Sequence, residues 1–405
     1  MATTHLTDPP TLQDSESRGA KAASGSREPA AAQPPLEAKA PTLGEPKSVA
    51  AGPKAVWVSM QHALRQMGAG RTAQALLNVN QKDGFDCAGC AWPDPGKRKA
   101  AEFCENGAKA VAEEATTSRV DSHFFARFSV QELAQRSDHW LGRQGRLTEP
   151  MILRAGSSHY EPIAWDEAFR RIADQLKALE TPDQACFYTS GRASNEAAFT
   201  YQLFARAFGT NNLPDCSNMC HESSGVALSE ALGSGKGSVT LEDFEHADCI
   251  LVVGQNPGTN HPRMLGMLQE AARRGCAIIT INPLAEAGNT AFKDPQEVTG
   301  WVGSGTHFGA RHLPVRLNGD VALLKGFMKA LLEREDAEPG SVLDLEFIAH
   351  SCDGFESLKA DLHATDWSSI TKSSGIERSV IEETAATLAT SKRVIACWAM
   401  GLTQH

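Results

Sequence analysis

Two short apolar runs with a helical pattern between them stand out in the second half of the chain. Residues 249–253 (Cys-Ile-Leu-Val-Val) and 277–281 (Ala-Ile-Ile-Thr-Ile) are continuous apolar segments, which is typical of buried strands. Residues 264–274 repeat apolar side chains at helical spacing and end at Gly275. A strand, a helix and a strand in this order form a βαβ unit, so the pattern predicts a parallel sheet with a right-handed crossover.

Further helix and strand patterns flank this unit. Apolar residues recur at helical spacing over 165–179, and residues 195–208 form a second amphipathic pattern that Gly209 ends. Residues 186–189 and 393–398 have the composition of short strands. Alternating helices and strands predict the α/β fold class.

Residues 1–55 contain mostly Ala, Pro, Glu, Ser and Lys, which predicts a disordered tail. The tail lacks the apolar core of a secretory signal, so we expect a cytoplasmic protein. In a cytoplasmic protein, the ten cysteines of the chain are then thiols or metal ligands rather than disulfides. The formal net charge of −10 argues against a nucleic-acid-binding protein, and no apolar run is long enough for a membrane span.

Three cysteines, Cys87, Cys90 and Cys104, lie among glycine, proline and aspartate residues, which predicts a small, loop-rich domain organised by a metal. A two-residue spacer lets two sulfurs turn toward one centre, so the set suits an iron–sulfur cluster or zinc. A cubane cluster needs four ligands, and Asp86, Asp94, a distant residue or none could be the fourth. A cysteine-rich loop without a metal is the remaining alternative.

A thiol lies directly beside an imidazole at Cys220-His221. A thiolate is a soft ligand for a transition metal, and histidine exchanges protons near neutral pH. Downstream, the loop from Gly254 to Gly258 joins a strand to a helix, so its backbone amides and the positive end of the helix suit a phosphate. Asn282 follows the next strand at the same sheet edge. A tight turn without a ligand is the alternative interpretation.

Six longer motifs occur in one order along the chain. They begin at Gly84 (GFDCAGCAWPDP), Phe103 (FCENGAK), Tyr188 (YTSGR), Cys216 (CSNMCH), Gly254 (GQNPGTNHPR) and Trp398 (WAMGLTQH). Together they resemble the molybdopterin-dependent oxidoreductases, specifically the formate-dehydrogenase-like alpha subunits and their bacterial branch associated with acid resistance. The resemblance covers residues 79–405.

The resemblance implies an α/β fold of the formate dehydrogenase/DMSO reductase type. A small N-terminal iron–sulfur domain would precede parallel-sheet α/β domains, with the C-terminal part missing, because chains of this family are longer. We expect the fragment alone to hold cofactor poorly and to be inactive. The implied division is a tail at 1–55, an iron–sulfur-type domain at 56–150, the first piece of an α/β domain at 151–214 and a dinucleotide-binding-like α/β domain at 215–405.

The same resemblance implies the cofactors and their ligands. Cys220 would bind molybdenum and His221 would accept a proton, while Cys87, Cys90 and Cys104 would hold a [4Fe-4S] cluster. The molybdenum would be carried by two pterin guanine dinucleotides, as bis(molybdopterin guanine dinucleotide). Residues of the strand-end loops would bind these dinucleotides: Gly254, Asn256, Pro257, Gly258, Asn260, His261, Asn282, Asp320, Gly401, Thr403, Gln404 and His405.

The implied reaction is the two-electron oxidation of a small substrate such as formate, with electrons leaving through the cluster. Besides this small-molecule substrate, an electron-transfer protein or a cofactor-delivery protein is an expected partner. One cluster cysteine of the family pattern is absent, and Asn106 replaces the usual lysine. Two other interpretations therefore stay open: a catalytically silent relative that acts in acid or stress resistance, and a zinc-bound dinucleotide-binding module.

Overall fold

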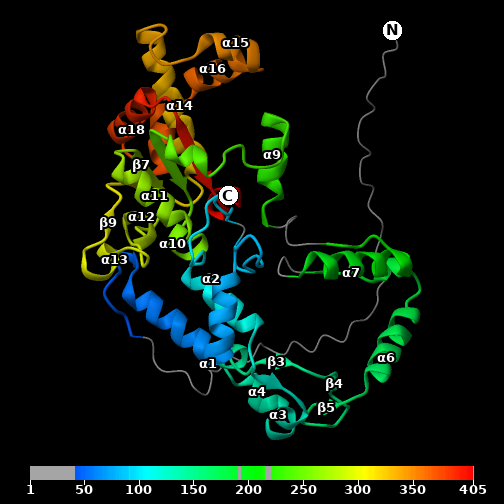
Figure 1. The fold of residues 1–405 in the computed structure, drawn as a ribbon. Helices are drawn as coiled ribbons and strands as arrows, with labels where there is room; N and C mark the ends of the chain where they lie inside the picture. The colour runs from blue at the N-terminus through cyan, green and yellow to red at the C-terminus, as the bar shows by residue number, and fades with distance from the viewer. Residues whose placement is uncertain (1–41, 91, 190–192, 215–219, 405) are drawn as a thin grey trace.

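The protein is represented by a computed structural model that describes residues 42–90, 92–189, 193–214 and 220–404 (Figure 1). A parallel sheet with its helices forms one body, drawn in yellow to red. The N-terminal helices, in blue and cyan, lie below this body in the same view, and a green arm of helices extends away from them. The mixed α/β fold that the sequence predicts is confirmed.

The central sheet of the described residues has four strands, all parallel, and its order places the predicted βαβ unit in the middle. Cys249 lies opposite Ala277 on one side and opposite Val394 on the other. The predicted parallel pairing is therefore confirmed. In spatial order the strands are β10 (Arg311–Leu313), β7 (Ala277–Ile281), β6 (Cys249–Val253) and β11 (Val394–Trp398).

Side chains of β6 alternate between two cores, because successive residues of a strand point to opposite faces. Ile250 and Val252 pack with Leu265 on one face. Leu251 and Val253 join the core on the other face. Burial on both faces explains why this strand is apolar throughout. The flanking helices are α11 (Met264–Arg273) for the first core and α14 (Asp320–Ala337), α17 (Trp367–Ser374) and α18 (Arg378–Thr390) for the second.

The N-terminal region contains a long helix where the sequence predicted a loop-rich domain. This helix, α1 (Pro53–Asn78), bends at Gly68, whose φ is 72°, and packs on α2 (Glu105–Glu114). Their contact combines small side chains such as Ala63 and Ala108 with larger ones such as Met67. The loop-rich prediction is wrong for this segment because alanines and glycines allow close helix packing without a strong amphipathic signal.

The predicted end of the disordered tail at residue 55 is also wrong. Strand β1 (Ala50–Ala51) pairs in parallel with β8 (Ala291–Lys293), and the backbone N–H of Gly52 donates to the carbonyl of Lys293. Pairing with a distant strand therefore orders the last residues of the expected tail. The antiparallel partner of β8 on its other side is β9 (Thr306–His307).

The arm consists of α6 (Trp165–Lys177) and α7 (Asn195–Phe208), and both helices follow the predicted pattern. Gly209 ends α7 in the left-handed conformation, with φ at 112°. The strand predicted over 186–189 is wrong, since residues 186–188 have no strand structure. Phe187 packs against the aromatic rings of α7 instead, so burial in this segment comes from a helix rather than a sheet.

Short elements make up the connections between these parts. No helix of the described residues has the length and apolar character needed to cross a membrane. The remaining elements are β2 (Arg119–Val120), α3 (Ser122–Arg127), α4 (Val130–Ala134), α5 (Asp138–Gly142), β3 (Arg146–Leu147), β4 (Met151–Ile152), β5 (Glu161–Pro162), η1 (Pro182–Gln184), α9 (Glu222–Leu232), η2 (Glu242–Glu245), α10 (Pro257–Asn260), α12 (Ala287–Thr290), α13 (Val298–Val302), α15 (Leu345–Ser351), α16 (Phe355–Ala364) and α19 (Met400–Thr403).

Candidate functional site

The loops after β6 and β11 meet through two glycines at the carboxyl edge of the central sheet. Gly254 has a φ of 62°, and a Cβ on it would lie 2.8 Å from the carbonyl carbon of Gly401. A Cβ on Gly401 would lie 2.4 Å from the carbonyl oxygen of Gly254. Only glycine permits such a backbone approach. This edge is where open parallel sheets bind ligands.

A second glycine contact joins the loops after β6 and β7. A Cβ on Gly288 would lie 2.5 Å from the backbone nitrogen of Gly258, and the side-chain oxygen of Asn256 would lie 3.4 Å from that Cβ. Asn282 donates from Nδ2 to the carbonyl of Gln255 at 3.2 Å. Three strand-end loops therefore converge on one point, as the sequence predicted for Gly254 and Asn282.

Several buried polar atoms of this edge have no hydrogen-bond partner among the described residues. They are Gln255 Oε1, Asn289 Oδ1 and His261 Nδ1. Burial lowers the pKa of His261, so the imidazole is neutral at pH 7. Buried polar groups in native proteins are nearly always satisfied by protein, water or a ligand. The unpartnered atoms therefore fit a polar group with donors and acceptors, as a nucleotide has.

Cys220 lies at the same edge, because the chain before α9 contacts the turn that follows β11. Its Sγ is 3.4 Å from Sδ of Met400, and Nε2 of Gln404 donates to its carbonyl at 3.4 Å. The thiol is half-buried, whereas His221 is exposed and caps the start of α9. The predicted thiol thus lies beside Gly401 and the loop contact described above.

Hydrogen bonds hold the start of α9 against the C-terminal turn. Ser223 Oγ donates to the carbonyl of Thr403 at 3.0 Å, and the hydroxyls of Ser224 and Thr403 lie 2.7 Å apart. Trp398 Nε1 donates to Ser224 Oγ at 3.0 Å. Sequence reasoning did not identify the two serines, although only Glu222 separates them from the Cys-His pair.

The other predicted ligands lie around this edge at varying depth. Pro257 is buried within α10, whereas Asn260 at the end of α10 is exposed. Asp320 is 2% exposed and begins α14 after β10, two strands away from β6. His405 lies outside the described residues.

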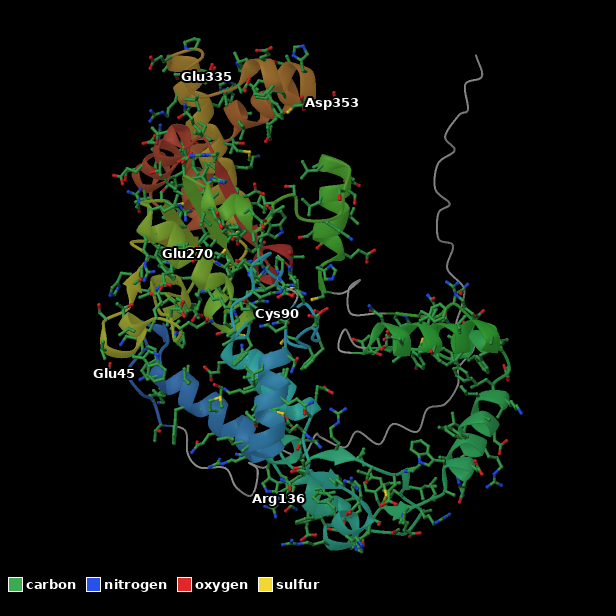
Figure 2. The ribbon with its side chains drawn as sticks, in the orientation of Figure 1. Glu45, Cys90, Arg136, Glu270, Glu335 and Asp353 are labelled. Carbon is green, nitrogen blue, oxygen red and sulfur yellow. The ribbon has the colours of Figure 1, made fainter. Side chains whose placement is uncertain are left out.

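The three predicted cluster cysteines lie together at the start of α2, as Figure 2 shows for Cys90 on the preceding loop. The sulfurs of Cys87 and Cys104 lie 3.0 and 3.8 Å from the place where a Cβ of Gly107 would stand. Burial raises the pKa of the Cys104 thiol, and the neighbouring Cys90 and Cys87 raise it further. Gly107 therefore leaves space that the sulfurs occupy.

Asp94, one of the alternatives for a fourth ligand, is paired with an arginine. Its carboxylate Oδ1 accepts a hydrogen bond from Arg263 Nη1 at 2.7 Å. Across residues 42–90, 92–189, 193–214 and 220–404, no three His, Cys, Asp or Glu side chains form a site for one metal ion.

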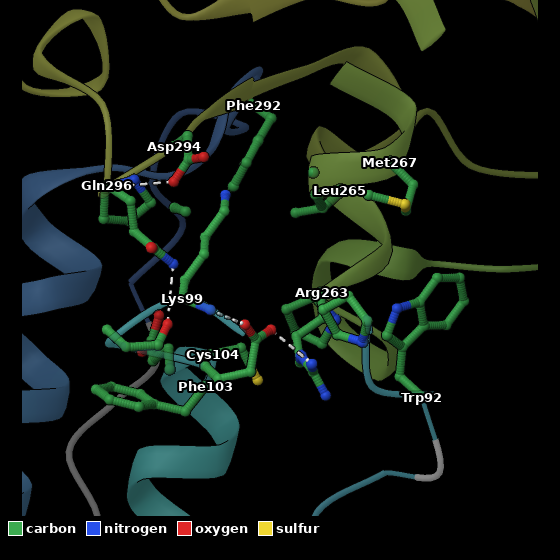
Figure 3. Close-up of a pocket in the computed structure, with 18 of the residues that line it drawn as sticks. Trp92, Lys99, Phe103, Cys104, Arg263, Leu265, Met267, Phe292, Asp294 and Gln296 are labelled. Carbon is green, nitrogen blue, oxygen red and sulfur yellow. Dashed lines mark hydrogen bonds and ion pairs between the residues drawn. The ribbon is translucent and has the colours of Figure 1, made fainter. Parts of the chain in front are cut away.

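Three side-chain links fasten the cysteine loop and the start of α2 to the body of the central sheet, and one of them is the donation from Gln296 Nε2 to the carbonyl of Ala101 at 3.0 Å. Asn106 Nδ2 donates to the carbonyl of Thr259 in α10 at 2.6 Å. Arg263 pairs with Asp94 and, through Nη2, with Glu102 Oε1 at 2.6 Å (Figure 3). Burial acts to lower the pKa of Arg263, but its hydrogen bonds to both carboxylates outweigh this effect and raise it. Sequence reasoning missed this arginine because both partners lie in a distant segment.

Comparison with known proteins gives the family. The family described as molybdopterin oxidoreductase matches residues 146–405. An uncharacterized oxidoreductase of Mycobacterium tuberculosis is 56% identical over 91% of this chain and 47% of its own length. Protein YdeP of Escherichia coli K12 is 46% identical over 86% of this chain and 46% of its own length.

More distant relatives have assigned names. Formate dehydrogenase H of Escherichia coli is 28% identical over 64% of this chain and 34% of its own length. The chain spans about half the length of the first two curated relatives it matches. Since the family match covers more than half of its residues, this chain belongs to the molybdopterin oxidoreductase family.

Proposed function

We propose that this chain is the part of a molybdenum-dependent oxidoreductase that contributes the metal-binding thiol and part of the dinucleotide site. The observation that carries the proposal is the place of Cys220. Its sulfur lies beside the turn at Gly401, which touches Gly254 at the carboxyl edge of the sheet. Family membership supports an oxidoreductase with a molybdenum–molybdopterin cofactor.

The residues of this edge suit the parts of such a cofactor. Gly254 and Gly258 let the strand-end loops approach one another closely, and the unpartnered atoms of Gln255, His261 and Asn289 provide polar contacts for a nucleotide. Predicted ligands farther out along the same edge, including Asp320 and Thr403, would complete the binding surface. The bis(molybdopterin guanine dinucleotide) form follows from the resemblance of the sequence motifs.

Cys220 and His221 would carry the reaction on the protein side. As a thiolate, Cys220 would bind molybdenum as a soft ligand. When bound, the molybdenum centre supplies the two-electron redox chemistry, for a small substrate such as formate. His221 is exposed next to the thiol, where it would take the substrate proton and release it to water.

Cys87, Cys90 and Cys104 would hold a [4Fe-4S] cluster, whose one-electron chemistry matches export of electrons to an electron-transfer protein. The position of Cys87 and Cys104 beside Gly107 supports this role, and the link from Asn106 to Thr259 keeps them close to the dinucleotide edge. A cofactor-delivery protein is a further proposed partner, and we propose a cytoplasmic location.

Paired cysteine variants in the full-length polypeptide, purified without oxygen, test the proposal. We expect Cys220→Ala to lose molybdenum and dye-linked formate oxidation while its iron content stays unchanged. Cys104→Ser should lose iron and the visible absorption of the cluster. Cys186→Ala is the matched control, because Cys186 is exposed and lies in another segment. Full molybdenum content in Cys220→Ala would overturn the role of that thiol.

A further inference from the structure

A cavity of about 680 Å³ lies between α1, the loop that leads to Cys104 and the first turns of α11 (Figure 3). Its walls include apolar side chains from distant segments, among them Met60, Leu265 and Phe292. Sites for small organic molecules span roughly 300 to 1,000 Å³ and are mostly apolar with a few polar groups. The cavity has the size and lining of such a site.

Flat aromatic surfaces and the ammonium group of Lys99 distinguish this cavity from a simple packing gap. Lys97 and Arg263 also line it, and Arg263 is paired with Asp94 and Glu102. The side chains of Trp92, Phe103 and Trp301 are among those that line it. Lys99 also lines it, and its ammonium group makes no hydrogen bond or ion pair with any residue in the described ranges. Flat rings stack on a planar ligand, and a free ammonium donates to a carbonyl oxygen.

The cavity also borders one of the proposed cluster cysteines. Cys104 belongs to its lining, together with the neighbouring Glu105. Lys97 and Glu242 at the rim are exposed, so the cavity opens to solvent. A planar molecule bound there would lie against the cysteine loop and remain able to exchange protons with water.

We propose that this cavity binds a small quinone-class electron carrier. Stacking on the aromatic walls would hold the ring, and Lys99 would donate a hydrogen bond to one carbonyl oxygen. In the redox step the quinone takes two electrons, one at a time, and two protons from water, and becomes the quinol. The reduced cluster is oxidised twice in return. The electron step rests on the proposed function, whereas the binding step does not.

Filling the cavity tests the binding step. Gly266 lines it within α11, and a Cβ there would meet no atom within 4 Å. We therefore expect Gly266→Leu to fold normally, since leucine favours a helix more than glycine does. Gly70→Leu is the matched control, because Gly70 also has open space around it and lies in α1 away from the cavity lining.

Equilibrium dialysis with tetramethyl-1,4-benzoquinone measures binding, since its fully substituted ring adds thiols poorly. We expect saturable binding at one molecule per chain, weakened at least about tenfold by Gly266→Leu and unchanged by Gly70→Leu. Lys99→Met should weaken binding by roughly tenfold, with Lys177→Met, an exposed lysine of α6, as its control. Unsaturable binding, or equal affinity in Gly266→Leu and the unmodified chain, would overturn the proposal.

Reoxidation of the reduced full-length protein tests the electron step. In protein that contains iron, we expect the quinone to restore the cluster absorption of the unmodified protein at least about ten times faster than the cluster absorption of Gly266→Leu. This rate should follow the fraction of cavities that hold quinone. Equal rates would overturn the electron step. If the protein contains no iron, the proposal of a cluster is wrong, but the dialysis result still decides whether the cavity binds the quinone. The two failures are therefore distinguishable.

Discussion

The buried ion pairs of Arg263 allow one link between the cysteine loop and the sheet to be tested quantitatively. Its guanidinium lies 2.7 Å from Asp94 and 2.6 Å from Glu102, and the three side chains are 12%, 20% and 10% exposed. Arg263→Met keeps much of the apolar stem but leaves Glu102 without its cation, whereas Asp94 keeps its ion pair with Arg98 at 3.6 Å. Removing one partner of a buried pair costs about 3 to 5 kcal/mol. Because these side chains retain some exposure, we expect about 3 kcal/mol.

Such a cost changes the equilibrium between the docked and open loop by roughly a hundredfold. Glu102 transmits the effect: its Oε2 accepts from the backbone N–H of Lys99 at 2.9 Å, and its carbonyl accepts from Asn80 Nδ2 at 2.7 Å. We therefore expect amides of residues 80–104 to exchange with deuterium roughly a hundred times faster in Arg263→Met. Hydrogen-exchange mass spectrometry on peptides from this range measures the change.

A second arginine of the same helix provides the control. Arg273 makes two hydrogen bonds to the carboxylate of Glu297, at 2.8 and 2.7 Å, but these side chains are 43% and 35% exposed. Exposed pairs contribute up to about 1 kcal/mol, so Arg273→Met should accelerate exchange around its partner by about fivefold or less. Equal acceleration in the two variants, or none in Arg263→Met, would refute the reasoning.

Two further predictions concern the sheet and its edge. Burial raises the pKa of Cys397 to about 12, so iodoacetamide at pH 9 should alkylate it about a hundredfold more slowly than the exposed Cys352. The protonated thiol of Cys397 contributes to the stability of the fold below the ordinary thiol pKa, and this contribution is lost as the pH rises toward 12. Comparable labelling rates for Cys397 and Cys352 would contradict the raised pKa. Gly254→Ala should lower the unfolding free energy by about 3 kcal/mol or more, through backbone strain and contact with Gly401. Calorimetry measures both variants. Gly156, with φ at 83°, has open space around it, so Gly156→Ala should lower the free energy of unfolding by only about 1 to 2 kcal/mol. Equal losses in the two variants would exclude the contact with Gly401 as a cause.

The central sheet was predictable because its signal is local. Residues 249–253 are apolar on both faces, and their pattern alone indicates a strand buried between two layers of helices. The two-residue strand Ala50–Ala51 carries no such signal, since its structure depends on pairing with residues more than two hundred positions away. Helix α1 was missed because its packing surface mixes alanines such as Ala63 with a few larger side chains such as Met67, which gives a weak amphipathic pattern.

The site was predictable only in part, for a related reason. A glycine loop after a buried strand marks Gly254 from the sequence alone. The neighbour of Cys220, in contrast, is Met400, separated from it by 180 positions, and no periodicity connects the two. Arg263 and Glu102 are likewise 161 positions apart, so their ion pair follows from tertiary packing and not from any local motif.

The links between segments differ in kind, and this difference predicts which parts of the site stay in place when others are disturbed. The contact between Gly254 and Gly401 is made by backbone alone, so only a substitution at a glycine disrupts it. The cysteine loop depends on the side chains of Arg263, Asn106 and Gln296, and can be released without changing the sheet edge. Loss of the cluster region should therefore leave the thiol of Cys220 in place, whereas separating the glycine contact should displace the turn that Cys220 packs against.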